Sequence, residues 1–373
     1  MKKVLIAFGT RPEAIKLAPL CRRLSKLSPD IRMVCCVTGQ HRQILDPMLK
    51  FFDITPDYDL NIIKEDQTLF HITIRVLEEI RPVLEKERPD LVVVQGDTTS
   101  AFVVTLAAYY LKIPVAHVEA GLRSYDKFQP YPEEINRRLL SHVADLHFCP
   151  TSQAAENLRK ENIPSESIYI TGNTVIDALL YTARMLDEGH EATQYLEELA
   201  LPPGRLILVT GHRRENFGQG LRNLSLALLD LVRSNPDVTV VYSVHPNPNV
   251  RGPVEAILGA EERVRLIPPP DYFRFVALMK RAFLIITDSG GIQEEAPSLK
   301  KPVLVARNVT ERPEAVEAGA AVLVGTDRDR IVAEAQKLLH DPDHYASMVL
   351  ESNPFGDGEA AEEIVQIIRK FLA

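Results

Sequence analysis

The hydrophobic pattern of the chain alternates between short, continuous apolar runs and longer stretches with helical spacing. The first half has apolar runs that predict strands at residues 4–8, 33–37, 91–94, 115–118 and 147–149. The second half has runs that predict strands at residues 206–209, 238–244, 264–267, 283–287 and 302–306. Apolar runs without polar alternation are typical of strands covered on both faces, as in parallel sheets.

Helical spacing fills the segments between these runs. The predicted helices are residues 14–27, 99–111, 133–144, 174–185, 222–234, 272–281, 330–340 and 359–371. Because strand and helix alternate, we predict parallel βα units and an α/β fold. The pattern restarts after Thr171-Gly172-Asn173, which predicts two doubly wound, Rossmann-like domains, residues 1–170 and 171–356. A turn-rich break precedes the last helix, and we expect residues 357–373 to return to the first domain.

Composition narrows the class of protein. A chain of 373 residues is longer than one hydrophobic core usually serves. A net charge of −8 with dispersed basic residues argues against nucleic-acid binding. The sequence has neither a run long enough for a membrane span nor a signal core, and its four cysteines have no CxxC spacing. We therefore expect a cytoplasmic enzyme with reduced thiols and no membrane partner.

The stretch from residue 283 to residue 304 joins a buried strand, a glycine turn and a helix predicted at residues 292–298. The turn is Asp288-Ser289-Gly290-Gly291. Glycines lack Cβ atoms, so backbone N–H groups can approach a ligand closely, and the helix directs its positive end at the same place. An anion site is predicted, with helix carboxylates near enough to bind sugar hydroxyls. The alternative is structural: Ser289 caps the helix and the glutamates complement its dipole.

Charged side chains follow several strands of the first domain. Ligands of open parallel sheets bind beyond the carboxyl ends of the strands. Arg11 and Lys16 follow the first strand, whereas Asp97, Glu119 and Glu133 follow later ones. Carboxylates at several strand ends favour acid/base chemistry. The alternatives are a helix cap at Asp97 or Thr98 and the acidic first turn of a helix for Glu133.

The strand ends of the second domain carry His212 and His245. Two histidines beside a glycine phosphate turn favour a functional role over a structural one. A metal site is disfavoured because no clustered set has ligand spacing. The sequence contains no GxGxxG, P-loop or GxSxG motif, so neither a nicotinamide cofactor nor a serine nucleophile is predicted.

Motifs along nearly the whole chain resemble one enzyme family. They are GTRPEAIK from Gly9, TGQHRQILD from Thr38, GDTTS from Gly96, HVEAGLRS from His117, PYPEEINR from Pro130, ITGNTVIDAL from Ile170, TGHRREN from Thr210, VHPNPNVR from Val244, ITDSGGIQEEAPSLKKPVL from Ile286, TERPEAVEAG from Thr310 and NPFGDGEA from Asn353. The chain is similar to the bacterial and archaeal non-hydrolysing UDP-N-acetylglucosamine 2-epimerases. That resemblance implies the two-domain fold of B-type glycosyltransferases, a nucleotide sugar in the cleft between the domains, and a homodimer.

The resemblance also implies a reaction. UDP-N-acetylglucosamine and UDP-N-acetylmannosamine would interconvert by anti elimination of UDP through 2-acetamidoglucal, followed by re-addition of UDP. This route needs no cofactor, and the implied partners are UDP-N-acetylglucosamine and UDP. Two alternatives remain open: a 2-epimerase of a modified UDP-N-acetylglucosamine derivative, and a B-type glycosyltransferase that uses a UDP sugar.

Matching positions imply roles for individual residues. The pyrophosphate would be held by Arg11, His212, Ser289, Gly290 and Gly291. Glu295 would bind the ribose hydroxyls, and Phe275 and Arg312 would lie near the uracil. Asp97, Glu119 and Glu133 would be the acid/base groups, with Lys16 beside them.

The resemblance further implies a second, activating nucleotide-sugar site. Its matching residues are Gln40, Gln43, Gln67, Glu133, Arg213 and His245. Asp66 departs from the family pattern, because arginine can stand there in relatives and an acid would repel a pyrophosphate.

Overall fold

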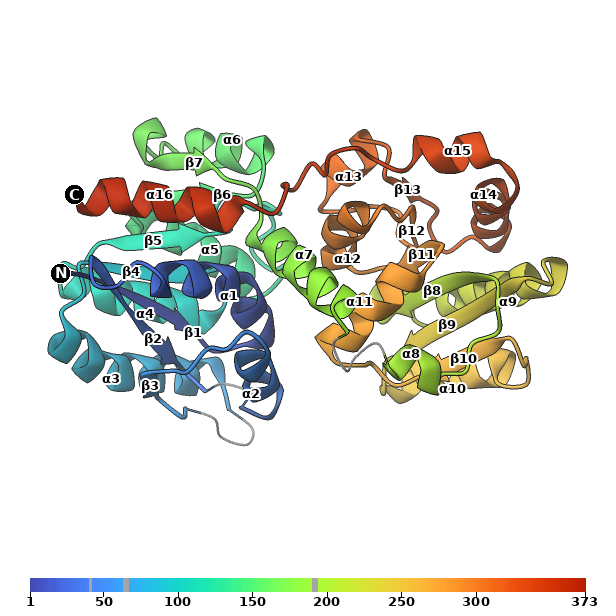
Figure 1. The fold of residues 1–373 in the computed structure, drawn as a ribbon, viewed down its shortest axis with the longest axis horizontal. Helices are drawn as coiled ribbons and strands as arrows, with labels where there is room; N and C mark the ends of the chain where they lie inside the picture. The colour runs from blue at the N-terminus through green and yellow to red at the C-terminus, as the bar shows by residue number, and fades with distance from the viewer. Residues whose placement is uncertain (40–41, 63–66, 190–193) are drawn as a thin grey trace. The chain divides into compact units, whose positions relative to one another are not determined.

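The computed structural model describes residues 1–39, 42–62, 67–189 and 194–373, with side chains omitted for residues 42–44. The chain divides into two compact units (Figure 1). The N-terminal unit contains residues 1–178 and 355–373, and the C-terminal unit contains residues 179–354. Each unit is built around one parallel sheet.

The sheet of the N-terminal unit has seven strands in the order β3-β2-β1-β4-β5-β6-β7. The strands are β1 (Lys2–Phe8), β2 (Ile31–Val37), β3 (Tyr58–Asp59), β4 (Leu91–Gln95), β5 (Val115–Val118), β6 (Leu146–Cys149) and β7 (Ile168–Ile170). The order reverses direction between β1 and β4, which is the topological switch point where such sheets bind ligands. The loops after these two strands carry Arg11 and Asp97.

Helices cover both faces of this sheet. They are α1 (Arg11–Ser25), α2 (Arg42–Phe51), α3 (Leu69–Glu87), α4 (Thr99–Tyr110), α5 (Glu133–Val143), α6 (Ser152–Lys160), α16 (Ala360–Leu372) and the start of α7 (Thr174–Asp187). Figure 1 shows the red C-terminal helix α16 among the elements of this unit. Arg23 of α1 is paired with Glu359 at 2.8 Å and with Glu362 at 2.5 Å, which anchors the start of α16.

The core of the N-terminal unit follows from the apolar runs. Side chains such as Leu5, Val34 and Val92 are fully buried against Ile80 and Val104 of the covering helices. Successive residues of a strand point to opposite faces, so a run that is apolar throughout is buried only when both faces are covered.

The sheet of the C-terminal unit has six strands in the order β10-β9-β8-β11-β12-β13. They are β8 (Arg205–Gly211), β9 (Val238–Val244), β10 (Val264–Ile267), β11 (Leu284–Thr287), β12 (Val303–Val305) and β13 (Ala321–Leu323). Its helices are the end of α7, α8 (Gln194–Glu198), α9 (Gln219–Ser234), α10 (Pro248–Leu258), α11 (Tyr272–Arg281), α12 (Gly290–Glu295), α13 (Pro313–Glu317), α14 (Arg328–His340) and α15 (Pro342–Ser347).

All ten predicted strands are present, and the two sheets confirm the predicted α/β class of doubly wound domains. Strands β3, β7 and β13 were not predicted, because edge strands of two or three residues are too short to show a hydrophobic period. The helix predicted at residues 292–298 begins two residues earlier and ends at Glu295, where a short 3₁₀ turn, Ala296–Leu299, continues the chain. Pro297 in that turn cannot donate a helical hydrogen bond. Among the described residues, none of the helices has the length and apolar character needed to cross a membrane.

Candidate functional site

Glu119 occupies an unusual backbone conformation directly after β5. Its φ angle is +64°, in the left-handed region that residues other than glycine rarely adopt. Its carboxylate is ion-paired with Lys16 of α1 and accepts a hydrogen bond from Asn173 Nδ2 at 2.9 Å. The Lys16 and Glu119 side chains are 16% and 7% exposed. Backbone strain held by neighbouring contacts is a feature of functional sites, so the structure supports a role for this carboxylate.

Asp97 lies at the end of the neighbouring strand, β4. Its carboxylate is ion-paired with Arg137 of α5, and its carbonyl accepts a hydrogen bond from Asn136 Nδ2 at 3.0 Å. Burial raises the pKa of Asp97, Arg137 lowers it, and the negative charge of Glu119 raises it again. The two carboxylates are therefore close enough to affect each other's charge. Of the two alternative helix caps, Thr98 is confirmed, because its hydroxyl accepts a hydrogen bond from Ala101 N at the start of α4, and Asp97 is not the cap.

Glu133 is the first residue of α5. Its Oε2 atom is buried and makes no hydrogen bond within the described part of the chain. A buried carboxylate oxygen without a donor is costly and calls for an explanation, which a bound sugar hydroxyl would supply. Its place in the first turn also fits the dipole alternative, so the role of Glu133 stays a prediction.

A further buried carboxylate, Glu13, which was not predicted as a site residue, links these loops. Glu13 is 1% exposed, and its Oε2 accepts hydrogen bonds from Gly9 N at 3.0 Å and Thr10 N at 2.7 Å. Its Oε1 accepts from the Thr98 hydroxyl at 2.7 Å, which ties the loop after β1 to the loop after β4. Burial raises the pKa of Glu13. The sequence pattern that could have identified Glu13 is a capping box, in which a threonine is followed three residues later by a glutamate.

Arg11 and Lys16 differ in their surroundings. Arg11 is exposed at the first position of α1, where the backbone N–H groups of a helix start favour anions. Lys16 lies one turn further, and its ammonium is paired with Glu119. Lys16 therefore lies beside Glu119, one of the predicted acid/base groups, and its role stays a prediction.

Asp288 organises the turn after β8 in the C-terminal unit. It is fully buried, and its Oδ2 accepts hydrogen bonds from His212 N at 2.9 Å and Arg213 N at 2.8 Å. Asn216 Nδ2 donates to the same oxygen at 3.2 Å, and His212 Nδ1 lies 3.3 Å from Oδ1. Asp288 is part of the glycine turn in the sequence, but no sequence pattern indicated a role for it.

The glycine turn leaves room for a ligand. Ser289 is the N-cap residue of α12, but within the described structure its hydroxyl makes no capping hydrogen bond, so the capping alternative is wrong. A Cβ atom at Gly290 or Gly291 would meet no described atom closer than 4.0 Å, and neither residue has a positive φ. Since neither packing nor backbone conformation requires glycine here, an approaching ligand is the remaining physical reason.

The two glutamates of α12 have different partners. Glu294, 2% exposed, is ion-paired with Arg312, whereas Glu295 accepts a hydrogen bond from the Tyr272 hydroxyl of α11 at 3.3 Å. Burial, followed by the charge of Glu295, raises the pKa of Tyr272. Phe275, the predicted neighbour of the uracil, lies on the same helix, α11. Glu295 therefore contacts α11, the helix that carries Phe275, whereas Glu294 is paired with Arg312.

His245 and Arg213 lie next to the His212 turn. The ring of His245 stacks on the ring of His212, with centroids 6.1 Å apart and planes at 20°. Arg213 Nε donates to the Asp288 carbonyl at 3.2 Å. Gln40 and Asp66 lie outside the described residues, as does the side chain of Gln43. The Oε1 atom of Gln67 is buried and makes no hydrogen bond to the described residues. The second nucleotide-sugar site therefore stays a prediction.

An arginine after β12 links two loops of the C-terminal unit. Arg307 is 7% exposed and is ion-paired with Glu215 at 2.8 Å and Glu311 at 2.6 Å. Burial by itself would raise the pKa of Glu311, but the positive charge and hydrogen bonds of Arg307 lower that pKa to about 2. The pairing joins the turn that follows His212 to the loop that precedes Arg312.

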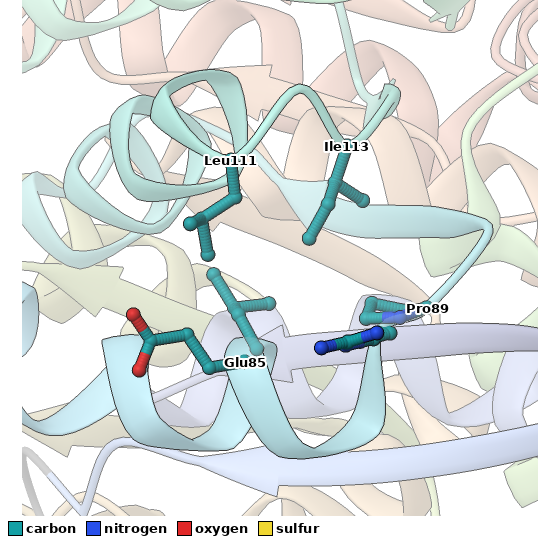
Figure 2. A pocket seen from close by; sticks show the side chains of 6 residues that line it. Glu85, Pro89, Leu111 and Ile113 are labelled. Atoms are coloured by element: carbon teal, nitrogen blue, oxygen red, sulfur yellow. The ribbon is translucent and has the colours of Figure 1, made fainter.

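A pocket of about 330 Å³ lies elsewhere in the N-terminal unit (Figure 2). Figure 2 shows Leu111 and Ile113 across it from Glu85 and Pro89. Pro89 and Ile113 lie shortly before β4 and β5, so the pocket lies at the amino ends of these strands. The predicted catalytic residues follow the carboxyl ends, and none of them lines this pocket.

Comparisons with known proteins match the whole chain. The family model described as UDP-N-acetylglucosamine 2-epimerase matches residues 23–369. A relative from Salmonella typhimurium, UDP-N-acetylglucosamine 2-epimerase, is 52% identical over 372 residues, 99% of each chain. The relative of the same name from Escherichia coli K12 is 52% identical over 373 residues, 98% of each chain.

Solved structures agree in fold. UDP-GlcNAc 2-epimerase from Neisseria meningitidis bound to UDP-GlcNAc has a TM-score of 0.90 and 46% identity, covering 99% of this chain and 100% of that chain. The enzyme of Methanocaldococcus jannaschii in complex with UDP-GlcNAc and UDP has a TM-score of 0.81 and 36% identity, covering 99% of both chains.

Proposed function

Because the chain belongs to the UDP-N-acetylglucosamine 2-epimerase family and is therefore an isomerase, we propose that it interconverts UDP-N-acetylglucosamine and UDP-N-acetylmannosamine. The observation that carries this proposal is the 52% identity, over practically the full length, to relatives named for that reaction. The same match agrees with the resemblance inferred from the motifs.

The C-terminal unit supplies the groups suited to UDP. Ser289, Gly290 and Gly291 present a hydroxyl and backbone N–H groups around an open space, with His212 on the adjoining turn. A pyrophosphate leaving C1 gains negative charge, and fixed donors and cations stabilise that charge in the transition state. The carboxylate of Glu295 accepts hydrogen bonds from the ribose hydroxyls.

The N-terminal unit supplies the acid/base groups. One carboxylate of Asp97, Glu119 and Glu133 removes the C2 proton. The C–H electron pair forms the C1=C2 bond, and the C1–O pair leaves with UDP. The product of this step is 2-acetamidoglucal. Re-addition of the UDP oxygen to C1, with a proton delivered to the other face of C2, gives the epimer without net oxidation.

The electrostatics support acid/base work by Asp97. Its pKa is raised chiefly by burial and further by Glu119, so it holds a proton more readily than an exposed aspartate. A catalytic acid or base is most effective when its pKa lies near the working pH. Lys16 and Asn173 hold the Glu119 carboxylate in a fixed place beside it.

Incubation with UDP-N-acetylglucosamine in D₂O, without an acceptor, tests the proposal. We expect deuterium at C2 and a product of manno configuration, both observable by proton NMR. A glycosyltransferase would leave C2 undeuterated without an acceptor. An epimerase of a modified sugar would bind UDP but leave UDP-N-acetylglucosamine unchanged. Either result would overturn the proposed substrate and reaction.

The family resemblance also leads us to propose a cytoplasmic homodimer. Light scattering coupled to gel filtration should give twice the chain mass. A monomer mass at micromolar concentration would overturn the dimer without affecting the proposed chemistry.

A further inference from the structure

We propose that Asp288 is a positioning residue for the leaving group, because it fixes the His212 ring with one nitrogen turned towards the protein and the other towards the pyrophosphate. This inference rests on the proposed function, since UDP is the anion that His212 would meet. Asp288 itself is fully buried, so its effect on the leaving group would pass through the His212 ring.

The contacts of Asp288 leave little freedom to its carboxylate. Oδ2 accepts from two successive backbone N–H groups, those of His212 and Arg213, and from Asn216 Nδ2. Asn216 also donates to the Ala306 carbonyl at 3.1 Å. Three donors reach Oδ2, whereas Oδ1 is buried and makes no hydrogen bond to the described residues. The imidazole Nδ1 lies 3.3 Å from Oδ1, so it is the nitrogen placed to approach this oxygen.

The end of β11, which directly precedes Asp288, is held by further hydrogen bonds. The hydroxyls of Thr210 and Thr287 are hydrogen-bonded across β8 and β11 at 2.6 Å. Thr287 Oγ1 also accepts from Ser289 N at 3.0 Å. These hydrogen bonds connect the residues on both sides of Asp288, Thr287 and Ser289, to β8, the strand that leads to His212.

The imidazole is exposed on its other side. The His212 side chain is 47% exposed, and the ring of His245 stacks on it at 6.1 Å. An imidazole that turns Nδ1 towards one group presents Nε2 on the opposite side of the ring. With Nδ1 turned to Asp288, Nε2 is the nitrogen that meets the pyrophosphate in the proposed complex. Asp288 thus fixes the direction from which His212 approaches the leaving group.

The competing explanation is that Asp288 only braces the backbone of the turn. In that case its loss would misplace the turn whether or not the imidazole is present. If Asp288 acts through the ring, its loss should have little further effect once the ring is removed. A double-mutant cycle separates the two explanations.

We would measure UDP binding by calorimetry for wild type, Asp288→Asn, His212→Ala and the double variant. Charge-assisted hydrogen bonds of this kind predict that each single substitution weakens UDP binding roughly 10- to 100-fold. The double variant should bind within about threefold of His212→Ala. An equal loss from Asp288→Asn in the presence and absence of the His212 ring would overturn the inference.

The matched control is Asp341→Asn. Asp341 also accepts two backbone N–H groups, those of Asp343 at 3.0 Å and His344 at 2.9 Å, but it is exposed at the start of α15. We expect unchanged UDP affinity. A loss equal to that of Asp288→Asn would show that removing any such carboxylate has the same effect, which would also overturn the inference.

A measurement on the wild-type chain keeps the inference testable if Asp288→Asn does not fold. Nitrogen-15 NMR of labelled histidine, with His212→Ala to assign the signal, should show a proton on His212 Nδ1. An unprotonated Nδ1 would overturn the inference. Failure of the wild type to bind UDP would instead refute the proposed function, and the NMR result would still report on Asp288 and His212.

Discussion

Asp177 is a buried carboxylate whose charge should reduce the stability of the N-terminal unit. It lies on α7 with 6% of its surface exposed, and its Oδ1 accepts the backbone N–H of Ala361 in α16 at 2.9 Å. Its Oδ2 is buried without a hydrogen bond to the described residues. Burial raises the pKa of Asp177 from 3.8 to about 6. Replacement by asparagine keeps the acceptor for Ala361 and removes the charge.

The sign of the effect follows from proton linkage. A raised pKa in the folded state contributes stability that is fully present below the unfolded pKa and lost as the pH rises through about 6. A shift of about 2 pH units corresponds to about 3 kcal/mol, of which about 2 kcal/mol falls between pH 4 and pH 7.5. Wild type should therefore lose about 2 kcal/mol relative to Asp177→Asn over that interval.

Urea unfolding followed by far-UV circular dichroism measures this difference, since the chain has no tryptophan. The informative quantity is how the difference in stability between wild type and Asp177→Asn changes with pH. Any cost of the new amide that does not depend on pH cancels from that change. Asp30→Asn, which removes an exposed charge from the same unit, should follow the wild type. Parallel pH curves for wild type and Asp177→Asn would refute the reasoning.

Three further predictions concern the site. Asp97→Asn, Glu119→Gln and Glu133→Gln should each keep UDP binding but slow C2 deuterium exchange by roughly 10²- to 10⁴-fold; near-normal turnover in one of them would remove that residue from the chemistry. Asn173→Ala should lower kcat roughly 10- to 100-fold through Glu119 and leave the calorimetric affinity for UDP unchanged; a kcat within twofold of wild type would contradict this role. Gly291→Ala should change the free energy of unfolding by less than about 0.5 kcal/mol yet weaken UDP binding at least about tenfold, and normal affinity would show that the ligand does not use that space.

Most of the architecture could be predicted because each long apolar run must be buried on both faces of a sheet. The candidate residues could be found at the strand ends for a related reason: in a parallel sheet all carboxyl ends meet at one edge, whatever their separation in sequence. The short edge strands were missed because their few residues show no hydrophobic period, and edge positions are only partly buried.

The partners of the candidate residues could not be predicted. Lys16 and Glu119 are 103 residues apart, and His212 and Asp288 are 76 apart. No local pattern reports which carboxylate faces which cation across such distances. The neighbouring residues Glu294 and Glu295 show the same limit, because their different partners depend on how α12 packs against its surroundings.

The sequence by itself determined the two parallel sheets, the edge where the candidate residues gather and the family, because hydrophobic period and local motifs are properties of short segments. Only the tertiary structure decided the left-handed backbone of Glu119, the pairing of Lys16 with it, and the buried braces Glu13 and Asp288. These features depend on hydrogen bonds and charges brought together by folding. Burial strengthens each of these hydrogen bonds and ion pairs, because water no longer competes for the polar groups.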